Sequence, residues 1–380
     1  MTTTSPDGRL GVAVVGHAFM GRAHSLAWRE VGAFAADLPP VAQRVLVGRD
    51  RAGVEADATR LGWEGVETDW RTVLERDDVQ LVDVCVPGHL HAEVAVAALE
   101  AGKHVLVEKP LANTLVEAEK MVEVARAARE HGVRSMVGFN YRRVPALALA
   151  RRLVADGRVG VVRQVRVSYL QDWLVDAAAP MTWRLRRETA GSGALGDLAS
   201  HALDQVRYLL GQEVRSVHAT TRTFVPRRDG DDGPEDVTVD DAAWATLQTD
   251  GGAVVSLEVS RMATGRKNAL EVEVYGDRGA LRFDLERMNE LGTCLDGADA
   301  FTRVLATEAD HPYVGGWWPP GHVLGWDHTF VHQAADLLRA VADGTDPTPS
   351  FEDGLAVQRV LAAVERSAAS STVEHLEVLP

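Results

Sequence analysis

A lysine at the end of a short apolar run is a strong candidate for chemistry in this chain. The run Val105–Val107 leads directly into Glu108, Lys109 and Pro110. An uninterrupted apolar run of this length is typical of a buried parallel strand. Ligands bind at the carboxyl ends of such strands, so we expect Glu108 and Lys109 to project into a crevice. The alternative is a solvated Glu–Lys pair at the strand end.

A carboxylate and an imidazole four residues apart form a second candidate. Asp197 and His201 follow the glycine-rich stretch 191–196, and in an α-helix they would share one face. A carboxylate one turn from an imidazole orients the ring and raises its basicity, which suits a general base near neutral pH. The alternative is a structural role, with Asp197 capping the helix.

The segment that follows the first apolar run has the spacing of a dinucleotide-binding loop, with alanine in place of the middle glycine. The first glycine allows a tight turn, the alanine lets a pyrophosphate approach the backbone, and the last glycine lets the helix pack closely. The next helix would offer its first N–H groups to the phosphates. The alternative is a merely tight turn. The residues expected to bind the cofactor here are Gly16, Ala18, Phe19, Met20 and Gly21.

The end of the second expected strand bears on which nicotinamide cofactor is used. Gly48 followed by Arg49 can admit and pair the 2′-phosphate of NADP, whereas Asp50 could bind the free 2′-hydroxyl of NAD. Arg49 could also stack on adenine or face solvent. The motif leans slightly to NADP and leaves both cofactors open. Further cofactor contacts are expected beyond the third strand, from Val86, Pro87 and His91.

Composition narrows the class of protein. The chain has 380 residues, enough for two domains. A net charge of −15 makes nucleic acid or an anionic membrane an unfavourable partner. Two cysteines without paired spacing exclude a disulfide framework and a cysteine-based zinc site, and they fit a reducing cytoplasm. The polar N-terminus has no secretory signal pattern, so we expect a cytoplasmic protein.

Elements that could position these residues follow from hydrophobic periodicity. Short apolar runs alternate with amphipathic stretches up to about residue 140, which predicts an α/β Rossmann domain over 1–140 with a doubly wound parallel sheet. Helices are expected at 91–101 and 115–131. The expected strands are 11–16, 44–48, 81–87, 105–108 and 135–139.

The rest of the chain, 141–380, predicts an α+β domain for substrate binding and oligomerisation. Several segments alternate apolar and polar residues, which is typical of a large, mainly antiparallel open sheet with one free face. That face argues for a homo-oligomer, a dimer or tetramer. The loop with Trp317 and Trp318 could be a lid or an interface. Helices are expected at 145–156, 330–342 and 354–369, and strands at 161–170, 214–224, 237–249, 253–260, 270–275 and 280–284.

Taken together, these segments resemble the glucose–fructose oxidoreductase/inositol dehydrogenase/MocA (Gfo/Idh/MocA) family, and within it sugar dehydrogenases of the levoglucosan dehydrogenase kind. The resemblance covers essentially the whole chain. The segments that carry it are Gly16–Gly21, Pro87 to His91, Glu108-Lys109-Pro110, Phe139-Asn140-Tyr141-Arg142, Tyr169–Trp173 and Gly193–His201. Its catalytic lysine, aspartate and histidine match Lys109, Asp197 and His201. Glu108, Lys109 and Asn140 join the expected cofactor contacts.

The resemblance implies an NAD(P)-dependent oxidoreductase that oxidises a secondary hydroxyl of a sugar, glycoside or cyclitol, with C3 as a candidate position. His201 would be the general base and Lys109 would stabilise the alkoxide, with no metal. The alternatives are a nicotinamide-dependent glycosidase that works by transient oxidation and a non-catalytic NAD(P)-sensing regulator. The expected substrate-binding residues are Lys109, Arg142, Gln171, Trp173, Arg184, Asp197 and His201.

Overall fold

The computed structural model describes residues 7–377. The chain divides into two compact units, each of which is built from two segments of the sequence. The first unit comprises 1–140 and 325–355, and the second comprises 141–324 and 356–380. The two units are described in turn.

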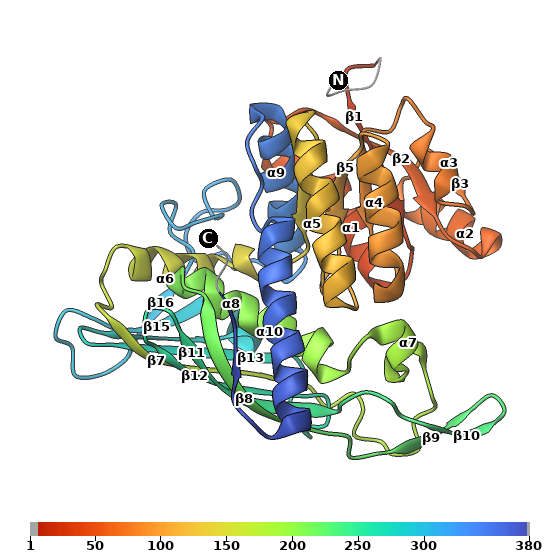
Figure 1. The fold of residues 1–380 in the computed structure, drawn as a ribbon. Coiled ribbons are helices and arrows are strands. Elements are labelled where there is room, and N and C mark those ends of the chain that lie inside the picture. Colours follow the sequence, from red (N-terminus) through yellow and green to blue (C-terminus); the bar gives the residue numbers. More distant parts are fainter. Residues whose placement is uncertain (1–6, 378–380) are drawn as a thin grey trace. The chain divides into compact units, whose positions relative to one another are not determined.

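A six-stranded parallel sheet forms the centre of the first unit (Figure 1). Its strand order β3-β2-β1-β4-β5-β6 is that of a Rossmann fold, in which ligands bind at the carboxyl ends of the strands where the order reverses. Every residue of β1, β4 and β5 is buried, which explains why these strands are apolar except for Asp83 in β4 and His104 in β5. The strands are β1 (Leu10–Val15), β2 (Val41–Val47), β3 (Gly65–Glu67), β4 (Leu81–Val84), β5 (His104–Val107) and β6 (Ser135–Val137).

Helices connect these strands as the alternation of patterns predicted. Strand β3 was not predicted: it has only three residues, too few for a periodic signal, and pairs with β2 at the sheet edge. Helix α5 begins with a complete capping box between Thr114 and Glu117. The helices are α1 (Phe19–Phe34), α2 (Arg51–Leu61), α3 (Arg71–Leu74), α4 (His91–Glu100) and α5 (Leu115–Glu130).

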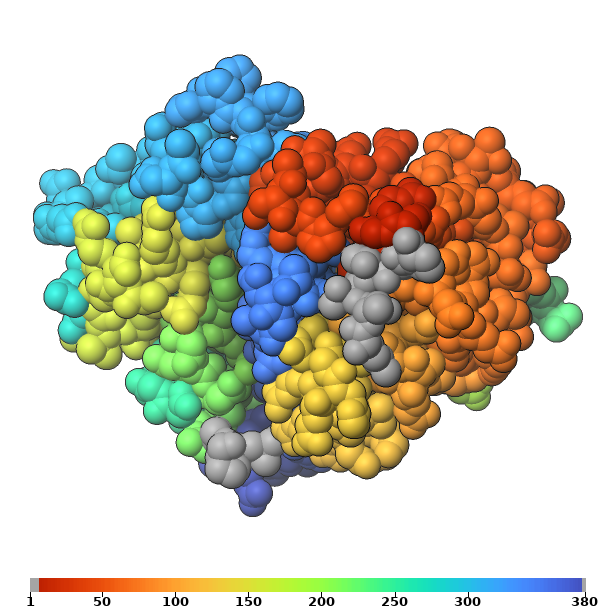
Figure 2. Space-filling view, turned by 90° about the horizontal axis from the view of Figure 1, so that it is seen from above, coloured from red at the N-terminus to blue at the C-terminus, as the bar shows by residue number. Residues whose placement is uncertain are grey.

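A segment from late in the chain completes the first unit. Helix α9 (His328–Asp343) packs against α1, and in Figure 2 blue residues of this late segment border red residues of the N-terminal part. The sequence analysis had placed all of 141–380 in one domain. The structure instead groups 325–355 with the Rossmann sheet, because the apolar face of α9 covers α1.

A nine-stranded sheet forms the second unit. All of its neighbouring pairs are antiparallel except β7 with β12, so the expected mainly antiparallel sheet is confirmed. Buried and exposed residues alternate along β11 and β12, as expected for a sheet with one packed face. Its order is β16-β15-β14-β13-β7-β12-β11-β8-β17. The main strands are β7 (Val162–Leu170), β8 (Val214–Arg222), β11 (Ala242–Thr249), β12 (Val254–Ser260), β13 (Ala269–Gly276) and β14 (Ala280–Asp284).

Helices α6 (Pro145–Ala155) and α8 (Ser200–Leu210) contact each other; α8 contacts β7 and α6 contacts β14. The 226–236 connection contains the hairpin β9 (Arg227–Gly230) and β10 (Gly233–Asp236). Strand β15 (Glu290–Cys294) and the two edge strands, β16 (Thr302–Leu305) and β17 (Glu374–His375), were not predicted. Helix α10 (Phe351–Ser370) starts in the first unit and continues in the second.

Within residues 7–377, none of the helices combines the length and apolar character that a bilayer crossing needs.

Candidate active site

The loop between β1 and α1 has the backbone shape that a dinucleotide pyrophosphate needs. Gly16 has a φ of +107°, and a Cβ added there would lie 2.5 Å from the Cys85 carbonyl oxygen. A Cβ at Gly21 would lie 1.9 Å from the Gly16 carbonyl oxygen. Ala18 caps α1 without a side-chain hydrogen bond, and the first turn contains no acidic residue. The first N–H groups of α1 can therefore bind an anion, so the loop fits the expected cofactor.

Phe19 and Met20 begin α1 beside this loop. The Phe19 side chain is 63% exposed, and its ring stacks on Trp326 with centroids 5.5 Å apart. Trp326 in turn packs edge-on against Phe330 of α9, at 4.6 Å. The late segment of the first unit thus supports the predicted phosphate loop through an aromatic contact that the sequence analysis did not anticipate.

The end of β2 carries the residues that distinguish the two nicotinamide cofactors. Asp50 accepts the Gly53 N–H at 3.2 Å and so caps α2. Arg49 is exposed, and among the described residues it makes no hydrogen bond or ion pair. His17 was not predicted to contribute here, yet its ring lies against Gly48, where a Cβ would come within 2.3 Å of it.

His91, a predicted cofactor contact that follows β4 in the chain, bonds to the protein backbone. It is buried, and its ring nitrogens lie 2.9 Å from the Pro110 carbonyl oxygen and 3.0 Å from that of Val86. His91 therefore links the segments that follow β4 and β5. Val86 and Pro87 are half-buried. Asn140 is also buried, and its side-chain amide donates to Thr329 Oγ1 at 2.8 Å.

At the end of β5 the structure separates the two charged residues that the sequence analysis treated together. Lys109 is half-buried, and its peptide bond to Pro110 is cis. Glu108 does not project into a crevice as expected; it is only 5% exposed, because its carboxylate turns inward to His24. Glu108 also accepts the backbone N–H of Lys109, at 3.2 Å.

In the second unit, Asp197 lies in a single turn of π-helix, Leu195–Ala199, which leads into α8. The expected regular α-helix therefore begins only at Ser200, and the wider turn displaces Asp197 from ideal four-residue spacing to His201. Asp240, which was not predicted, accepts the N–H groups of Gly193 and Leu195, each at 2.8 Å. The buried Asp240 carboxylate, and not Asp197, anchors the start of this segment.

His201 lies near the N-terminus of α8 and is 5% exposed. Its ring packs on Tyr141 at 4.5 Å and edge-on against Tyr169 at 6.0 Å. The two phenol oxygens are 3.0 Å apart, and Tyr169 donates to Asn268 Oδ1 at 2.7 Å. Burial, together with Tyr141 and the negative charge of Asp197, raises the pKa of Tyr169 well above its usual value, so this phenol stays protonated. These three partners were absent from the predicted site.

Two of the predicted sugar contacts join this group. Gln171 donates to Asn268 Oδ1 at 2.8 Å and accepts the indole N–H of Trp173 at 3.0 Å. Trp173 is 42% exposed, so its ring is available to a ligand. The buried guanidinium of Arg261, also missed, lies 5.4 Å from that ring and donates to the Asp240 carbonyl oxygen.

The two predicted arginines differ in their surroundings. The Arg142 Nε lies 3.0 Å from both carboxylate oxygens of Asp204, and both residues are buried. Since Asp204 is on α8, this ion pair holds the helix that carries His201. Arg184 is exposed, and its guanidinium lies 4.5 Å from the Trp183 ring.

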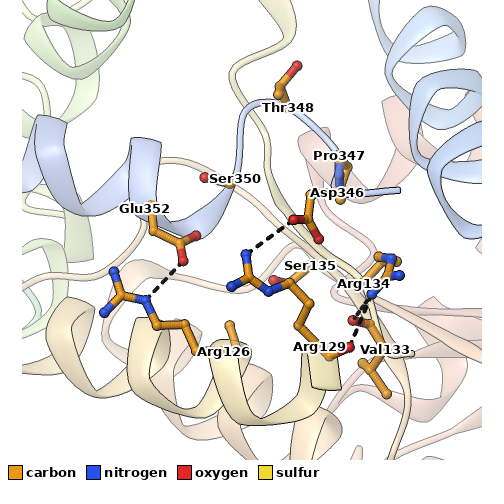
Figure 3. A pocket seen from close by; sticks show the side chains of 11 residues that line it. Arg126, Arg129, Val133, Arg134, Ser135, Asp346, Pro347, Thr348, Ser350 and Glu352 are labelled. Carbon is orange, nitrogen blue, oxygen red and sulfur yellow. Dashed lines mark hydrogen bonds and ion pairs between the residues drawn. The ribbon is translucent and has the colours of Figure 1, made fainter. Parts of the chain in front are cut away.

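A separate hollow of about 290 Å³ lies in the first unit between α5, β6 and residues 346–352 (Figure 3). Arg126 pairs with Glu352 and Arg129 with Asp346, each at 3.1 Å. An anion would have to displace these carboxylates. The hollow therefore joins the late segment to α5 and is distinct from the candidate site.

The parallel sheet, its phosphate loop and the histidine-bearing second unit define the class: an oxidoreductase that uses a nicotinamide dinucleotide. A family model described as "Oxidoreductase family, NAD-binding Rossmann fold" matches residues 10–139, and "GFO/IDH/MocA C-terminal domain" matches 147–282. The chain belongs to the Gfo/Idh/MocA oxidoreductase family. The expected family, fold class and cofactor class are confirmed.

Two named dehydrogenases resemble this chain, the first of them along nearly its full length. Levoglucosan dehydrogenase of Pseudarthrobacter phenanthrenivorans is 38% identical, covering 96% of this chain and 97% of that protein. Inositol 2-dehydrogenase of Rhizobium meliloti is 28% identical, covering 77% and 79%.

Solved structures agree. An oxidoreductase domain protein from Kribbella flavida has a TM-score of 0.95 at 55% identity, covering 97% of this chain and all 100% of that one. Levoglucosan dehydrogenase in complex with NADH has a TM-score of 0.94 at 38% identity, covering 98% and 100%. A further complex of that enzyme contains NADH and levoglucosan.

Proposed function

We propose that this protein is an NAD(P)-dependent dehydrogenase acting on a secondary hydroxyl of a sugar, glycoside or cyclitol, with C3 as the first position to test. The observation that carries the proposal is the setting of His201: a buried imidazole on α8, packed on Tyr141 and Tyr169 and preceded by Asp197. The likeness to levoglucosan dehydrogenase over 96% of the chain supports the substrate class.

In this proposal His201 takes the hydroxyl proton as general base, and Asp197 orients the imidazole. The Lys109 ammonium stabilises the negative charge that develops on the oxygen. The bound nicotinamide supplies the hydride acceptor. The scheme needs no metal, because the lysine provides the positive charge that a metal provides in other alcohol dehydrogenases.

Substrate recognition would use the polar and aromatic groups around His201. The exposed face of Trp173 can stack on the CH face of a sugar ring, and Gln171 and Asn268 offer amide groups to its hydroxyls. Arg184 is an exposed cation available to a substrate. Arg142 would act at one remove, since its guanidinium binds Asp204 on α8.

We also propose that the protein is cytoplasmic and assembles into a dimer or tetramer. The outward face of the second unit's sheet exposes large apolar residues, with Trp244 36% and Val254 41% exposed, which supports association between copies.

The proposal is tested by offering anhydrosugars, monosaccharides and inositols with each nicotinamide cofactor and recording the absorbance of the reduced ring. We expect net reduction with at least one sugar or cyclitol. We also expect Lys109→Ala and His201→Ala to lower kcat at least about a hundredfold while NADH binding, followed by fluorescence, survives.

Three results would count against it. Release of the aglycone from an added aryl glycoside without accumulation of reduced cofactor would indicate the glycosidase alternative. Normal turnover in both variants would remove the assigned roles, and cofactor binding with no turnover of any sugar would favour the sensing regulator.

A further inference from the structure

A buried ion-pair network in the first unit ends at Glu108, the residue that precedes Lys109. His24 of α1 is 1% exposed, and both of its ring nitrogens face carboxylates. Its Nδ1 lies 2.8 Å from Asp83 Oδ2 on β4, and its Nε2 lies 3.0 Å from Glu108 Oε1 at the end of β5. One imidazole thus connects a helix and two adjacent strands.

The geometry requires the ring to donate in both directions. Asp83 also accepts the indole N–H of Trp28 at 2.7 Å, so its carboxylate is surrounded by donors. A neutral imidazole would leave a bare nitrogen facing a carboxylate oxygen. Burial alone would lower the pKa of His24, but the charge and hydrogen bond of Asp83 outweigh it and raise that pKa well above its usual value.

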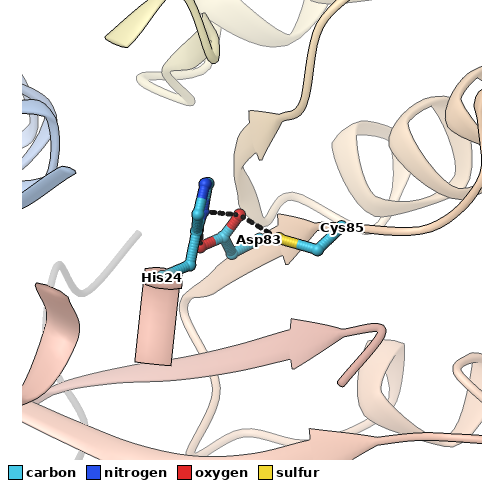
Figure 4. Close-up of side chains that lie close together, drawn as sticks. All are labelled: His24, Asp83 and Cys85. Atoms are coloured by element: carbon cyan, nitrogen blue, oxygen red, sulfur yellow. Dashed lines mark hydrogen bonds and ion pairs between the residues drawn. The ribbon is translucent and has the colours of Figure 1, made fainter. Parts of the chain in front are cut away.

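Three side chains of this region, His24, Asp83 and Cys85, lie close enough together to suggest a metal site (Figure 4). The contacts argue for a proton instead. The first nitrogen of His24 is hydrogen-bonded to Asp83 and the second to Glu108, which leaves no lone pair for a metal. Burial also raises the pKa of the Cys85 thiol, whereas a metal ligand would be a thiolate.

The far end of the network reaches the candidate catalytic lysine. Glu108 Oε1 is held by His24, and its other oxygen, Oε2, accepts the backbone N–H of Lys109 at 3.2 Å. The carboxylate has little room to move, because a Cβ at Gly138 would lie 2.8 Å from Oε1. Without His24 the buried charge of Glu108 would lose its partner and would rotate toward water, taking the Lys109 backbone with it.

We infer that His24 is a positioning residue of this enzyme: by bridging Asp83 and Glu108 it fixes the Glu108 carboxylate and, through it, the backbone at Lys109. This inference rests on the proposed function only for its effect on turnover. The effect on the backbone is independent of any substrate.

The first test reads the backbone by hydrogen exchange with mass spectrometry on the full chain. The reporter is the Lys109 amide, resolved by overlapping peptides, since Pro110 has no N–H. His24→Ala should exchange this amide at least about tenfold faster, while amides within β5 keep their protection. The matched control is His104→Ala, which opens a similar cavity at the other end of β5 without touching the network.

The second test separates turnover from binding. In His24→Ala we expect kcat to fall about ten- to a hundredfold, with the NADH dissociation constant changed less than about twofold, because a misplaced charge affects the reacting oxygen more than the cofactor. Imidazole added to this variant should restore part of kcat by filling the cavity. Where His24→Ala fails to fold, His24→Gln takes its place, since both donor hydrogens of the amide are on one nitrogen and cannot reproduce two separate ring N–H groups.

The outcomes decide between explanations. Unchanged Lys109 exchange and unchanged kcat in His24→Ala would overturn the inference, as would equal losses in the His104→Ala control. Stoichiometric zinc or another metal in the purified protein would replace it with a metal site. If wild type turns over no sugar, the proposed function fails, but the exchange experiment still decides whether His24 positions this backbone.

Discussion

Arg49 is the residue on which the choice of cofactor is best tested. Its exposed guanidinium has no protein partner among the described residues, whereas the neighbouring Asp50 already caps α2. A charge-assisted bond to a 2′-phosphate is worth about 1.5 kcal/mol or more, roughly tenfold in binding. We expect Arg49→Ser to lower kcat/KM for NADP about tenfold and to leave NAD within about twofold, measured with one sugar.

Arg51, an exposed residue at the start of α2 that pairs with Glu55, provides the matched control. Arg51→Ser should leave the NADP-to-NAD ratio unchanged. A ratio that stays constant in Arg49→Ser would show that the arginine faces solvent and takes no part in cofactor selection.

His104 predicts how stability depends on pH. It is buried at the start of β5, and its Nδ1 accepts the Arg134 N–H at 2.9 Å, so the folded protein needs the neutral ring. Burial, helped by the charge of Arg134, lowers the pKa of His104 from 6.5 to about 4. Since the unfolded chain takes up this proton more readily, His104 stabilises the fold above pH 6.5, and this contribution of about 3 kcal/mol is lost as the pH falls toward 4.

Denaturant unfolding at a series of pH values measures this dependence. His104→Gln should flatten the decline in the free energy of unfolding between pH 6.5 and pH 4, while the exposed His131→Gln should follow wild type. Identical slopes in wild type and His104→Gln would contradict the assignment.

Among elements, the π-helical turn before α8 shows where local structure depends on a distant residue. The Asp240 carboxylate accepts hydrogen bonds from the backbone N–H groups of Gly193 and Leu195, where that turn begins. The backbones are also close, since a Cβ at Gly193 would lie 1.7 Å from the Asp240 carbonyl oxygen. In Asp240→Asn, the side-chain NH₂ group would face one of these N–H groups, so that two donors meet and one hydrogen bond is lost. We expect a loss of about 1–3 kcal/mol in unfolding free energy and a fall in kcat, because Asp197 moves with the turn.

The exposed Asp236, also in the second unit, is the control: Asp236→Asn should leave stability and kcat unchanged. If Asp240→Asn lowered stability but left kcat and its pH profile intact, the turn would have no part in placing Asp197.

The sequence predicts strands most accurately where burial alone determines them. Parallel strands such as β1 and β5 are buried throughout, so their apolar runs are sufficient signals. The proposed catalytic residues Lys109, Asp197 and His201 were predicted from residue type and spacing, and the family resemblance supported them. Tyr141, Tyr169, Asn268 and Asp240 were missed as site residues because only the folding of the sheet brings them to His201 or its turn, and nothing in their local sequence records that distance.

At the scale of the molecule, the discontinuous first unit limits what periodicity can predict. The amphipathic pattern of α9 shows that one face is buried but not which surface covers it, so the helix was assigned to the wrong neighbours. Residues 1–140 alone should therefore expose the apolar surface of α1 and aggregate. A chain that joins 1–140 to 325–355 should be monomeric by light scattering and should bind NADH.

A monomeric 1–140 fragment that binds NADH as tightly as the full chain would show that α9 is dispensable. Loss of binding in both fragments would point to a need for the second unit.

The late return of α9 also has a consequence for biosynthesis. The nucleotide-binding sheet emerges first from the ribosome, yet the helix that seals its flank is translated only after most of the remaining polypeptide. During translation of the intervening residues, that flank of the nascent chain is therefore uncovered. Binding of chaperones to the nascent chain should be strongest during this period and should end soon after residue 355 leaves the exit tunnel.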